Sequence, residues 1–363
     1  MHFEIGSEFW QYSSSNKLTH QIPQWLHWGK ENRLLASGRT ALDHIIGDIK
    51  ATSTFKTVYM PSYCCHTMIE PFISNGVEVL FYDVVVDKNG GLDYHIDYQN
   101  NCDAVFIMSH FGYSSYDFSE IIEIFKYKKG KIIIEDATHS LFQKQAFNTN
   151  SDYIFASFRK WMAIPGGSLA SKMNDDFDID LPTKIHEEYV NLRVEGMRLK
   201  QAYMSKPNMD KKSFLQIFNE AEYLLDRDYK SYTIDDLSFS IIAQIDKNKL
   251  RSKRIANANY LIEGITKHSH IKPLFNKVDA NHCPLFVPII IKAGCRDSIN
   301  KHLIEKNVYC PVHWPKSDLH KLNRKSEFIY DHILSIPCDQ RYYLDDMDRI
   351  IEILINSKMD IEC

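Results

Sequence analysis

Apolar runs of strand length alternate with segments of helical periodicity along the first half of the chain. Residues 36–51 carry apolar side chains every three or four positions, and residues 66–76 and 118–129 follow the same period. Five apolar runs lie around these helical segments, at 57–64, 78–84, 103–112, 131–137 and 152–158. Apolar strands separated by helices predict βαβ units, in which helices cover both faces of a mainly parallel sheet.

A second, smaller α/β pattern follows a long charged segment. Residues 180–262 are mostly helical in pattern, and we interpret the basic run at 246–254 as the solvated face of a long helix. Alternation then restarts with a strand at 283–291 and a helix at 296–307. We therefore expect an α/β fold with three parts, namely an N-terminal arm (1–30), a large domain (31–245) and a small C-terminal domain (246–363).

Composition and charge indicate which classes of protein the chain can belong to. The 363 residues are 44% hydrophobic and 25% charged, as in ordinary globular proteins. Because 43 Lys and Arg stand against 47 Asp and Glu, we expect no nucleic-acid partner. No run of 18 apolar residues and no signal-peptide pattern occurs, and eight cysteines without CxxC spacing indicate free or buried thiols. These features predict a cytoplasmic protein that binds no membrane.

Polar residues stand where the predicted strands end, which is where open parallel sheets bind ligands. One group, Ser37, Gly38, Arg39 and Thr40, opens the helical segment at 36–51. Free backbone N–H groups and the helix dipole make such a turn an anion site. Taken alone, it is also an ordinary helix cap.

An acidic pair, Glu135 and Asp136, ends the strand pattern at 131–137. A carboxylate there can be a metal ligand, a base or the partner of a protonated heterocycle, or it can simply cap the next turn. His139 follows closely, but no second carboxylate cluster accompanies it, so we predict no metal site.

Lys160 directly follows the apolar strand pattern at 152–158 and leads into a Pro-Gly-Gly turn. A partly desolvated lysine has a lowered pKa and can form a Schiff base. Ser157 and Lys160 also form a Ser-x-x-Lys pair like that of penicillin-recognising acyl enzymes. We set that interpretation aside because the chain has no Lys-Thr-Gly element.

His110 and Tyr113 close another strand pattern, within the segment SHFGY. They could pack beside a planar ring, or His110 could be an ordinary structural histidine. One cofactor would use all four groups. Pyridoxal phosphate (PLP) needs a lysine, a carboxylate on its ring nitrogen and a helix N-terminus for its phosphate.

The same segments resemble the DegT/StrS-type sugar aminotransferases, a family of fold type I PLP-dependent enzymes. The resemblance covers most of the chain, and its motifs occur in the family's order. These motifs are SGRTALDHI, VYMPSYCCHTMIEPFISNGVEVLFYDV, SHFGY, IIIEDATHS, SFRKWMAIPGGSLA, LRSKRIANANYLIEGI, YCPVHWP and ILSIPCDQRY.

The resemblance implies roles for individual residues. Lys160 would bind PLP covalently and move a proton, Asp136 would pair with the pyridinium, and His139 would lie beside the ring. The phosphate would be held by Ser157, Thr40 and the backbone amides at 38–40. The other cofactor-site candidates are Ser37, Arg39, Tyr63, Cys65 and His110. The substrate candidates are Tyr113, Trp161, His313 and Arg341, of which the last two could instead fasten the small domain to the large one.

Three departures from the family pattern indicate a divergent branch. Arg39 replaces a small residue, and Cys65 falls where the family has the aromatic residue that stacks on the ring, a role that Tyr63 or His66 could take. The spacing from Ser157 to Lys160 is also shorter than in the characterised sugar enzymes.

The resemblance therefore implies a homodimeric aminotransferase. It would move an amino group from an amino acid, with glutamate as the expected donor, to a keto group of a nucleotide-linked sugar. Such a reaction would serve the synthesis of surface polysaccharide or a related glycan. Two alternatives stay open. One is another PLP reaction, such as elimination or desulfuration of an amino-acid-sized substrate, and the other is a non-catalytic binding subunit with this fold.

Overall fold

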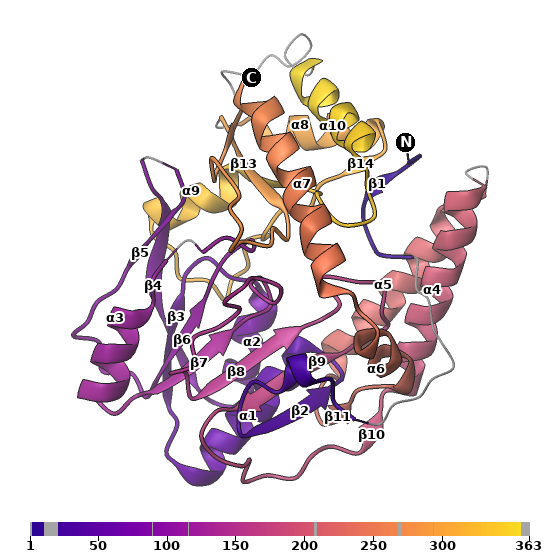
Figure 1. The fold of residues 1–363 in the computed structure, drawn as a ribbon. Coiled ribbons are helices and arrows are strands. Elements are labelled where there is room, and N and C mark those ends of the chain that lie inside the picture. The colour runs from indigo at the N-terminus through magenta and orange to yellow at the C-terminus, as the bar shows by residue number, and fades with distance from the viewer. Residues whose placement is uncertain are drawn as a thin grey trace.

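The computed structural model describes residues 2–10, 21–88, 90–114, 116–206, 209–267, 271–292 and 294–356. A ten-stranded sheet dominates its larger part, with strand order β10-β11-β2-β9-β8-β7-β6-β3-β4-β5 (Figure 1). The central strands are parallel and confirm the five strands predicted from the apolar runs. They are β3 (Thr57–Pro61), β4 (Glu78–Val86), β6 (Ala104–Met108), β7 (Ile132–Asp136) and β8 (Tyr153–Ser157).

Strands outside this centre were not predicted. β9 (Ser168–Lys172) runs antiparallel between β8 and β2 (Glu31–Leu35), and β5 (Leu92–His95) is antiparallel to β4 at the other edge. Two short strands, β10 (Lys184–Ile185) and β11 (Tyr232–Thr233), complete the sheet beyond β2. The sheet is therefore parallel at its centre and mixed at both sides.

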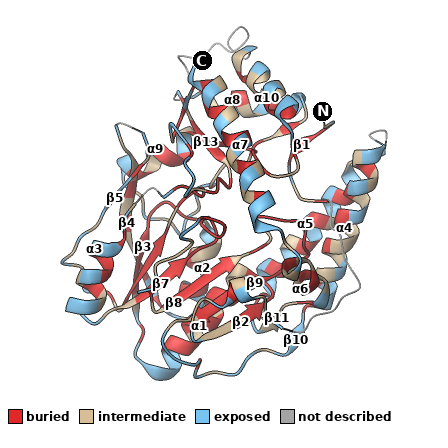
Figure 2. Ribbon diagram, in the orientation of Figure 1, coloured by how far each residue is buried: buried red, intermediate tan, exposed pale blue. Residues whose placement is uncertain are grey.

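Helices flank this sheet. α1 (Gly38–Thr52) packs against β8 and β9 through its buried apolar side, and α2 (His66–Ser74) packs against α1 and β4. α3 (Ser119–Ile122) continues as a π-helical segment, Glu123–Lys128. Figure 2 shows the central strands almost continuously buried, as a sheet covered on both faces requires. The remaining elements here are a 3₁₀ turn (Gln24–Leu26), α4 (Glu187–Ser205), α5 (Lys212–Arg227) and α6 (Asp236–Ala243).

A three-stranded antiparallel sheet organises the C-terminal part. It contains β12 (Ile271–Pro273), β13 (Val287–Ile291) and β15 (Ile333–Ile336). The long helix α7 (Lys247–Thr266) packs against this sheet and against α10 (Leu344–Asn356). The other helices are α8 (Arg296–Glu305) and α9 (Arg324–His332). No helix in the described ranges is both long enough and apolar enough to span a membrane.

The N-terminal segment 2–10 joins the two parts. β1 (Ile5–Gly6) pairs in parallel with β14 (Val308–Tyr309) of the C-terminal part. Beside it, the fully buried carboxylate of Glu4 lies 3.2 Å from Lys200 Nζ on α4 and 2.6 Å from Lys211 Nζ. Burial lowers the pKa of Lys200 to about 8, although attraction to Glu4 opposes the shift. This cluster holds the segment against α4 and the first residues before α5.

We predict that Glu4→Ala destabilises the protein by about 3–5 kcal/mol, because it leaves the buried ammonium of Lys200 without its counter-charge. Urea unfolding followed by circular dichroism measures the change. Glu195→Ala is the matched control, since it removes an exposed ion pair with Arg198 and should cost less than about 1 kcal/mol. Equal losses for the two variants would contradict a structural role for the Glu4 cluster.

Candidate active site

Two cavities meet at Arg159 and Lys160, beyond the carboxyl ends of the central strands. The inner cavity, about 300 Å³, lies between the start of α1, the ends of β7 and β8, and residues 65–68. The outer cavity, about 380 Å³, lies between Lys160, the N-terminal segment and the C-terminal part. Both include Lys160 in their walls, so a group held by that side chain can face either space.

The N-terminus of α1 forms one end of the inner cavity. Ser37 is its cap, and its Oγ accepts a hydrogen bond from the Thr40 N–H at 3.1 Å. The N–H groups of Gly38 and Arg39, also in the first turn, have no acceptor within the helix. A Cβ on Gly38 would lie only 3.1 Å from Ser157 Cβ, so glycine keeps this corner open. The helix end thus presents two backbone donors to the cavity.

The side chains of Thr40 and Arg39 both have partners within the protein. The Thr40 hydroxyl is buried and donates to the Tyr229 carbonyl at 2.6 Å. The Arg39 guanidinium pairs with Asp226 at 2.7 Å and lies 5.2 Å from the centroid of the Tyr229 ring. Arg39 therefore closes the cavity wall against the end of α5, in the position where the resemblance expects a small residue.

Asp136 ends β7 at the base of the inner cavity and is buried. Its Oδ1 accepts a hydrogen bond from the Thr138 N–H at 2.8 Å. Burial raises the pKa of Asp136 to about 6, and hydrogen bonding from Thr138 and the charge of Lys160 limit the rise. A cation brought into this cavity would therefore find a carboxylate that becomes ionised near neutral pH.

Glu135, the other member of the acidic pair, has a structural role. Successive residues of a strand point to opposite faces, so Glu135 points away from the Asp136 side. Its Oε2 accepts hydrogen bonds from the Asn148 N–H at 2.9 Å and the Ser151 hydroxyl at 2.6 Å. Glu135 thus caps the following turn, whereas Asp136 lines the inner cavity.

Lys160 projects from the turn after β8 with an exposed side chain, while the neighbouring Arg159 is held by Glu222 on α5. The positive charge of Lys160 acts on Asp136 and also lowers the pKa of His313, although burial has the larger effect on that histidine. Lys160 thus lies at the junction of the two cavities beside Arg159, whose charge is paired with Glu222.

Tyr63, His110 and His139 lie behind the cavities, in a buried aromatic cluster. His110 donates from Nε2 to the Tyr63 carbonyl at 2.9 Å, and burial lowers its pKa to about 4. His139 Nδ1 accepts from the Phe111 N–H at 3.0 Å, and its ring stacks on Trp314 with centroids 5.5 Å apart. None of the three is among the residues that line either cavity, so they act here as support for the wall.

Two of the four substrate candidates line a cavity, and the other two are packed outside both cavities. His313 and Arg341 line the outer cavity. Tyr113 stacks on Phe275 at a centroid distance of 4.1 Å, outside both cavities. Trp161 is fully buried, and its Nε1 donates to the Thr138 carbonyl at 2.6 Å. The structure therefore places Tyr113 and Trp161 in packing positions.

The outer cavity is also lined by Glu8 and Asp339, which the sequence analysis did not find, and both carboxylates are paired with arginines. Arg341 binds both carboxylate oxygens of Asp339 at 2.8 Å. Glu8 accepts from Arg193 at 2.9 Å, and although burial raises its pKa, the Arg193 charge holds it at about 2. No local signal marks Glu8 as a site residue, because only the tertiary fold brings the N-terminal segment to Lys160.

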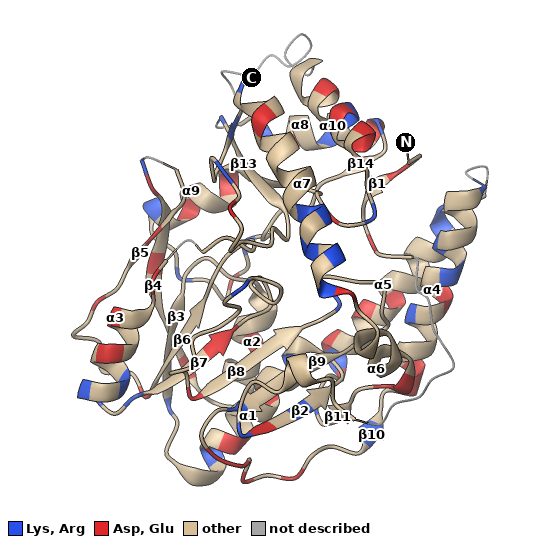
Figure 3. Ribbon diagram, in the orientation of Figure 1, with Lys and Arg blue, Asp and Glu red and all other residues tan. Residues whose placement is uncertain are grey.

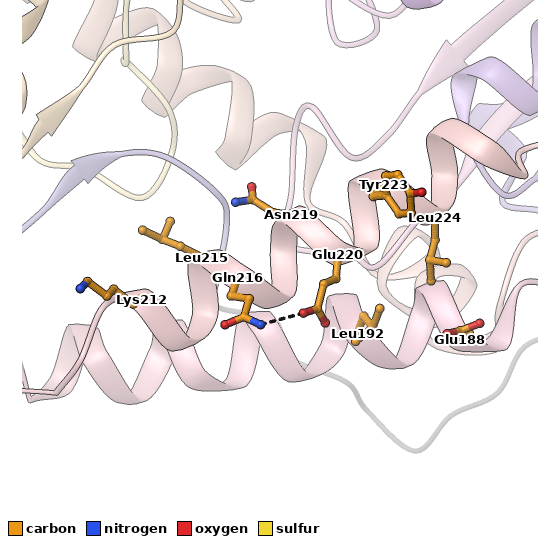
Figure 4. Close-up of a pocket in the computed structure, with 9 residues that line it drawn as sticks. All are labelled: Glu188, Leu192, Lys212, Leu215, Gln216, Asn219, Glu220, Tyr223 and Leu224. Atoms are coloured by element: carbon orange, nitrogen blue, oxygen red, sulfur yellow. Dashed lines mark hydrogen bonds between the residues drawn. The ribbon is translucent and has the colours of Figure 1, made fainter.

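A larger pocket of about 670 Å³ lies elsewhere, on the outer surface of α4 and α5 (Figure 4). Leu192, Leu215 and Tyr223 contribute to its open lining, and Gln216 donates to Glu220, one turn further along α5, at 2.9 Å. It contains neither Lys160 nor Asp136. We therefore assign the candidate active site to the inner and outer cavities.

No protein-family model and no curated protein matches the sequence. Solved structures do match. Helicobacter pylori PseC, an aminotransferase involved in the biosynthesis of pseudoaminic acid, aligns with a TM-score of 0.71 and 14% identity over 98% of this chain and 99% of that chain. A DegT DnrJ EryC1 StrS aminotransferase from Brucella abortus aligns with a TM-score of 0.60 and 17% identity, over 93% and 88% of the two chains.

The chain has the fold of these aminotransferases. Bacillus subtilis NtdA with bound cofactor PMP gives the same result, with a TM-score of 0.60, 15% identity, and coverage of 91% of this chain and 74% of that chain. The expected fold, a mainly parallel large sheet with a smaller C-terminal α/β unit, is confirmed. Sequence identities this low show a shared fold alone, and the chemistry depends on the residues of the site.

Cys65 caps the N-terminus of α2 and lines the inner cavity. We expect its thiol to be the most reactive among the described free cysteines. Burial raises its pKa, but hydrogen bonds with His66 and from the Thr67 hydroxyl, at 3.1 Å, outweigh burial and lower it overall. The other five free thiols are buried, namely Cys64, Cys102, Cys283, Cys310 and Cys338. Cys295 is disulfide-bonded, which corrects the expectation of a free or buried thiol there.

We predict that iodoacetamide at neutral pH modifies Cys65 at least about tenfold faster than the five buried thiols, because the thiolate is the reacting form. Peptide mass mapping over time measures this. Thr67→Val should slow the reaction by removing one hydrogen bond to the sulfur, and added PLP should slow it by filling the cavity. Labelling of Cys65 that PLP leaves unchanged would place the cofactor elsewhere.

Proposed function

We propose that this protein is a PLP-dependent aminotransferase of the DegT/StrS family. Its reaction would transfer an amino group from glutamate to a keto group of a nucleotide-linked sugar, for the synthesis of surface polysaccharide or a related glycan. The observation that supports it most is the inner cavity, where a helix N-terminus, a buried carboxylate and a lysine surround one space. These are the three groups that PLP requires.

The residues of the inner cavity fit this cofactor. A Cβ at position 38 would reduce the open space beside Gly38. This space lies beside the free N–H groups of α1 and suits a phosphate. Asp136 suits a protonated ring nitrogen, because such a cation would stabilise its buried carboxylate. When bound, PLP supplies an electron sink that makes the Cα–H bond of an amino acid acidic.

The residues of the chain would then have separate roles in the reaction. Lys160 Nζ would hold the cofactor and would move the proton from the substrate Cα. Asp136 would keep the charge on the ring nitrogen. Cys65, on the cavity wall at the start of α2, borders the space that a ring would fill. The N-terminal segment and the C-terminal part form walls of the outer cavity beside Lys160.

The outer cavity contains acceptors that suit the hydroxyl groups of a sugar. Glu8 and Asp339 line it, and the carbonyls of Pro284 and Leu285 accept from Arg254, another residue of the lining. The hydroxyl groups of a sugar ring can donate to such carboxylate and carbonyl oxygens. Aromatic side chains, including Phe286 and Tyr309, complete the lining.

The homodimer and the cytoplasmic location remain predictions drawn from the resemblance and the composition. The dimer is testable by analytical ultracentrifugation, which should give twice the mass of one chain. A monomer at micromolar concentration would contradict it.

The aminotransferase proposal is tested by mixing the PLP-loaded protein with glutamate alone. We expect loss of the cofactor's visible absorbance and formation of one equivalent of 2-oxoglutarate, with the cofactor left in its amine form. Lys160→Ala should abolish the reaction. Release of ammonia with pyruvate-type products from other amino acids would instead indicate elimination, and no reaction with any amino acid would support a binding subunit.

We further predict that Asp136→Asn still binds PLP but reacts with glutamate about ten- to a hundredfold more slowly, because it loses a charge-assisted hydrogen bond in a buried site. Stopped-flow absorbance measures the rate. The control is Glu135→Gln, which alters the neighbouring carboxylate on the opposite face and should leave the rate within about threefold. An unchanged rate in Asp136→Asn would remove Asp136 from the mechanism.

A further inference from the structure

Glu8 lies on the wall of the outer cavity and covers a buried arginine. Its carboxylate accepts a hydrogen bond from Arg193 Nη2 at 2.9 Å. The side chain of Glu8 is 42% exposed, whereas that of Arg193 on α4 is 1% exposed. Glu8 lines the outer cavity together with Arg159 and Lys160, and Arg193 does not belong to the lining. The Glu8 carboxylate therefore separates Arg193 from the space beside Lys160.

Arg193 has hydrogen-bonding capacity that its partners do not use. Its Nε and Nη1 atoms are buried and make no hydrogen bond to the described part of the chain. The other carboxylate near it, that of Glu222, lies 3.5 Å from Nη1 and is bound by Arg159. If Glu8 moved away, the two arginines would share one carboxylate. A buried guanidinium left in that state would attract another anion.

Positive charge surrounds the carboxylate of Glu8. Burial raises the pKa of Glu8, but the charges of Arg193, Arg159 and Lys160 outweigh burial and hold it at about 2. Figure 3 shows acidic and basic residues mixed along α4 and α5, the two helices that carry Arg193 and Glu222. A carboxylate supplied by a ligand would meet the same attraction in the place of the Glu8 carboxylate.

The backbone of Glu8 is fixed, so its side chain is the part that can move. The Glu8 carbonyl accepts from Lys200 Nζ at 2.8 Å and from Arg341 Nη1 at 3.2 Å. The next residue, Phe9, has its ring centroid 4.0 Å from the Arg341 guanidinium. Rotation about the side-chain bonds of Glu8 would therefore take its carboxylate away from Arg193 while the backbone of the N-terminal segment stays in place.

An aminotransferase of the proposed kind has to admit two unlike substrates beside one lysine. An acidic amino acid brings carboxylates, which need a cation, whereas a sugar brings hydroxyl groups, beside which an uncovered buried cation would be costly. We propose that the Glu8 side chain covers Arg193 while the sugar occupies the outer cavity, and turns away when a carboxylate of the amino donor binds Arg193 in its place. This inference rests on the proposed function and names the pair of residues that would distinguish its two substrates.

Glutarate is the probe that tests the proposal, because it carries the two carboxylates of glutamate and has no amino group to react. In calorimetric titration of the PLP-loaded protein, we expect Glu8→Gln to bind glutarate at least about tenfold more tightly than the parent, since no internal carboxylate has to be displaced. Glu8→Asp keeps the charge on a shorter side chain, so it should cover Arg193 less well and give an intermediate affinity. The double variant Glu8→Gln/Arg193→Gln should lose the gain.

Glu195→Gln is the matched control. It removes one negative charge from an exposed ion pair on the same helix as Arg193 and should leave the glutarate affinity within about twofold. An affinity of Glu8→Gln equal to that of the parent would overturn the proposal, as would a gain that persists in the double variant. Parent-like binding by Glu8→Asp would also overturn it, because net charge and not the position of the carboxylate would then set the affinity.

These results are separable from a failure of the aminotransferase function. If glutamate converts the cofactor in the parent while Glu8→Gln leaves glutarate binding unchanged, the proposed function stands and Glu8 has been assigned wrongly. If glutarate binding responds as expected while glutamate leaves the cofactor unchanged, Arg193 still binds carboxylates and the aminotransferase function fails.

Discussion

The buried carboxylate of Asp136 is the constraint on which the candidate site depends. A charge at the end of an inner strand is costly unless a cation lies nearby, and here burial raises the pKa of Asp136 to about 6. Lys160 supplies part of the compensation from the turn after the neighbouring strand. Because β7 and β8 are parallel, their carboxyl ends meet at one edge of the sheet, and the N-terminus of α1 reaches the same edge.

Contacts between distant segments form part of the wall at this edge. The N-terminal segment pairs with β14 through β1 and is held to α4 by Glu4 and Lys200. Its residues Gly6 to Phe9 form part of the outer cavity, so the same ion pairs that stabilise the fold also shape the space next to Lys160. Stability and substrate access are therefore linked in one short segment.

Sequence patterns predicted those features that local chemistry determines. The five parallel strands follow from apolar runs, the start of α1 from its small residues, and the positions of Asp136 and Lys160 from strand ends. The antiparallel insertion of β9 escaped prediction because strand order depends on pairing between distant segments. Periodicity alone did not separate Trp161, which is buried, from a substrate contact.

Long-range packing also explains the site residues that were missed. Glu8 and Asp339 reach the outer cavity from opposite ends of the chain. Glu8 lies in no motif, and Asp339 lies within ILSIPCDQRY, where only Arg341 was singled out as a candidate. The basic run at 246–254 was interpreted as solvated because a helical pattern alone cannot show which of its residues line a cavity, as Lys249 and Lys253 do.

Borohydride reduction of the PLP-loaded protein, followed by peptide mass mapping, tests the central claim most directly. We expect the reduced cofactor on the peptide that contains Lys160, and on no other lysine, with no incorporation in Lys160→Ala. Reduced cofactor on a different lysine, or none in the parent protein, would contradict the assignment of the inner cavity as a PLP site.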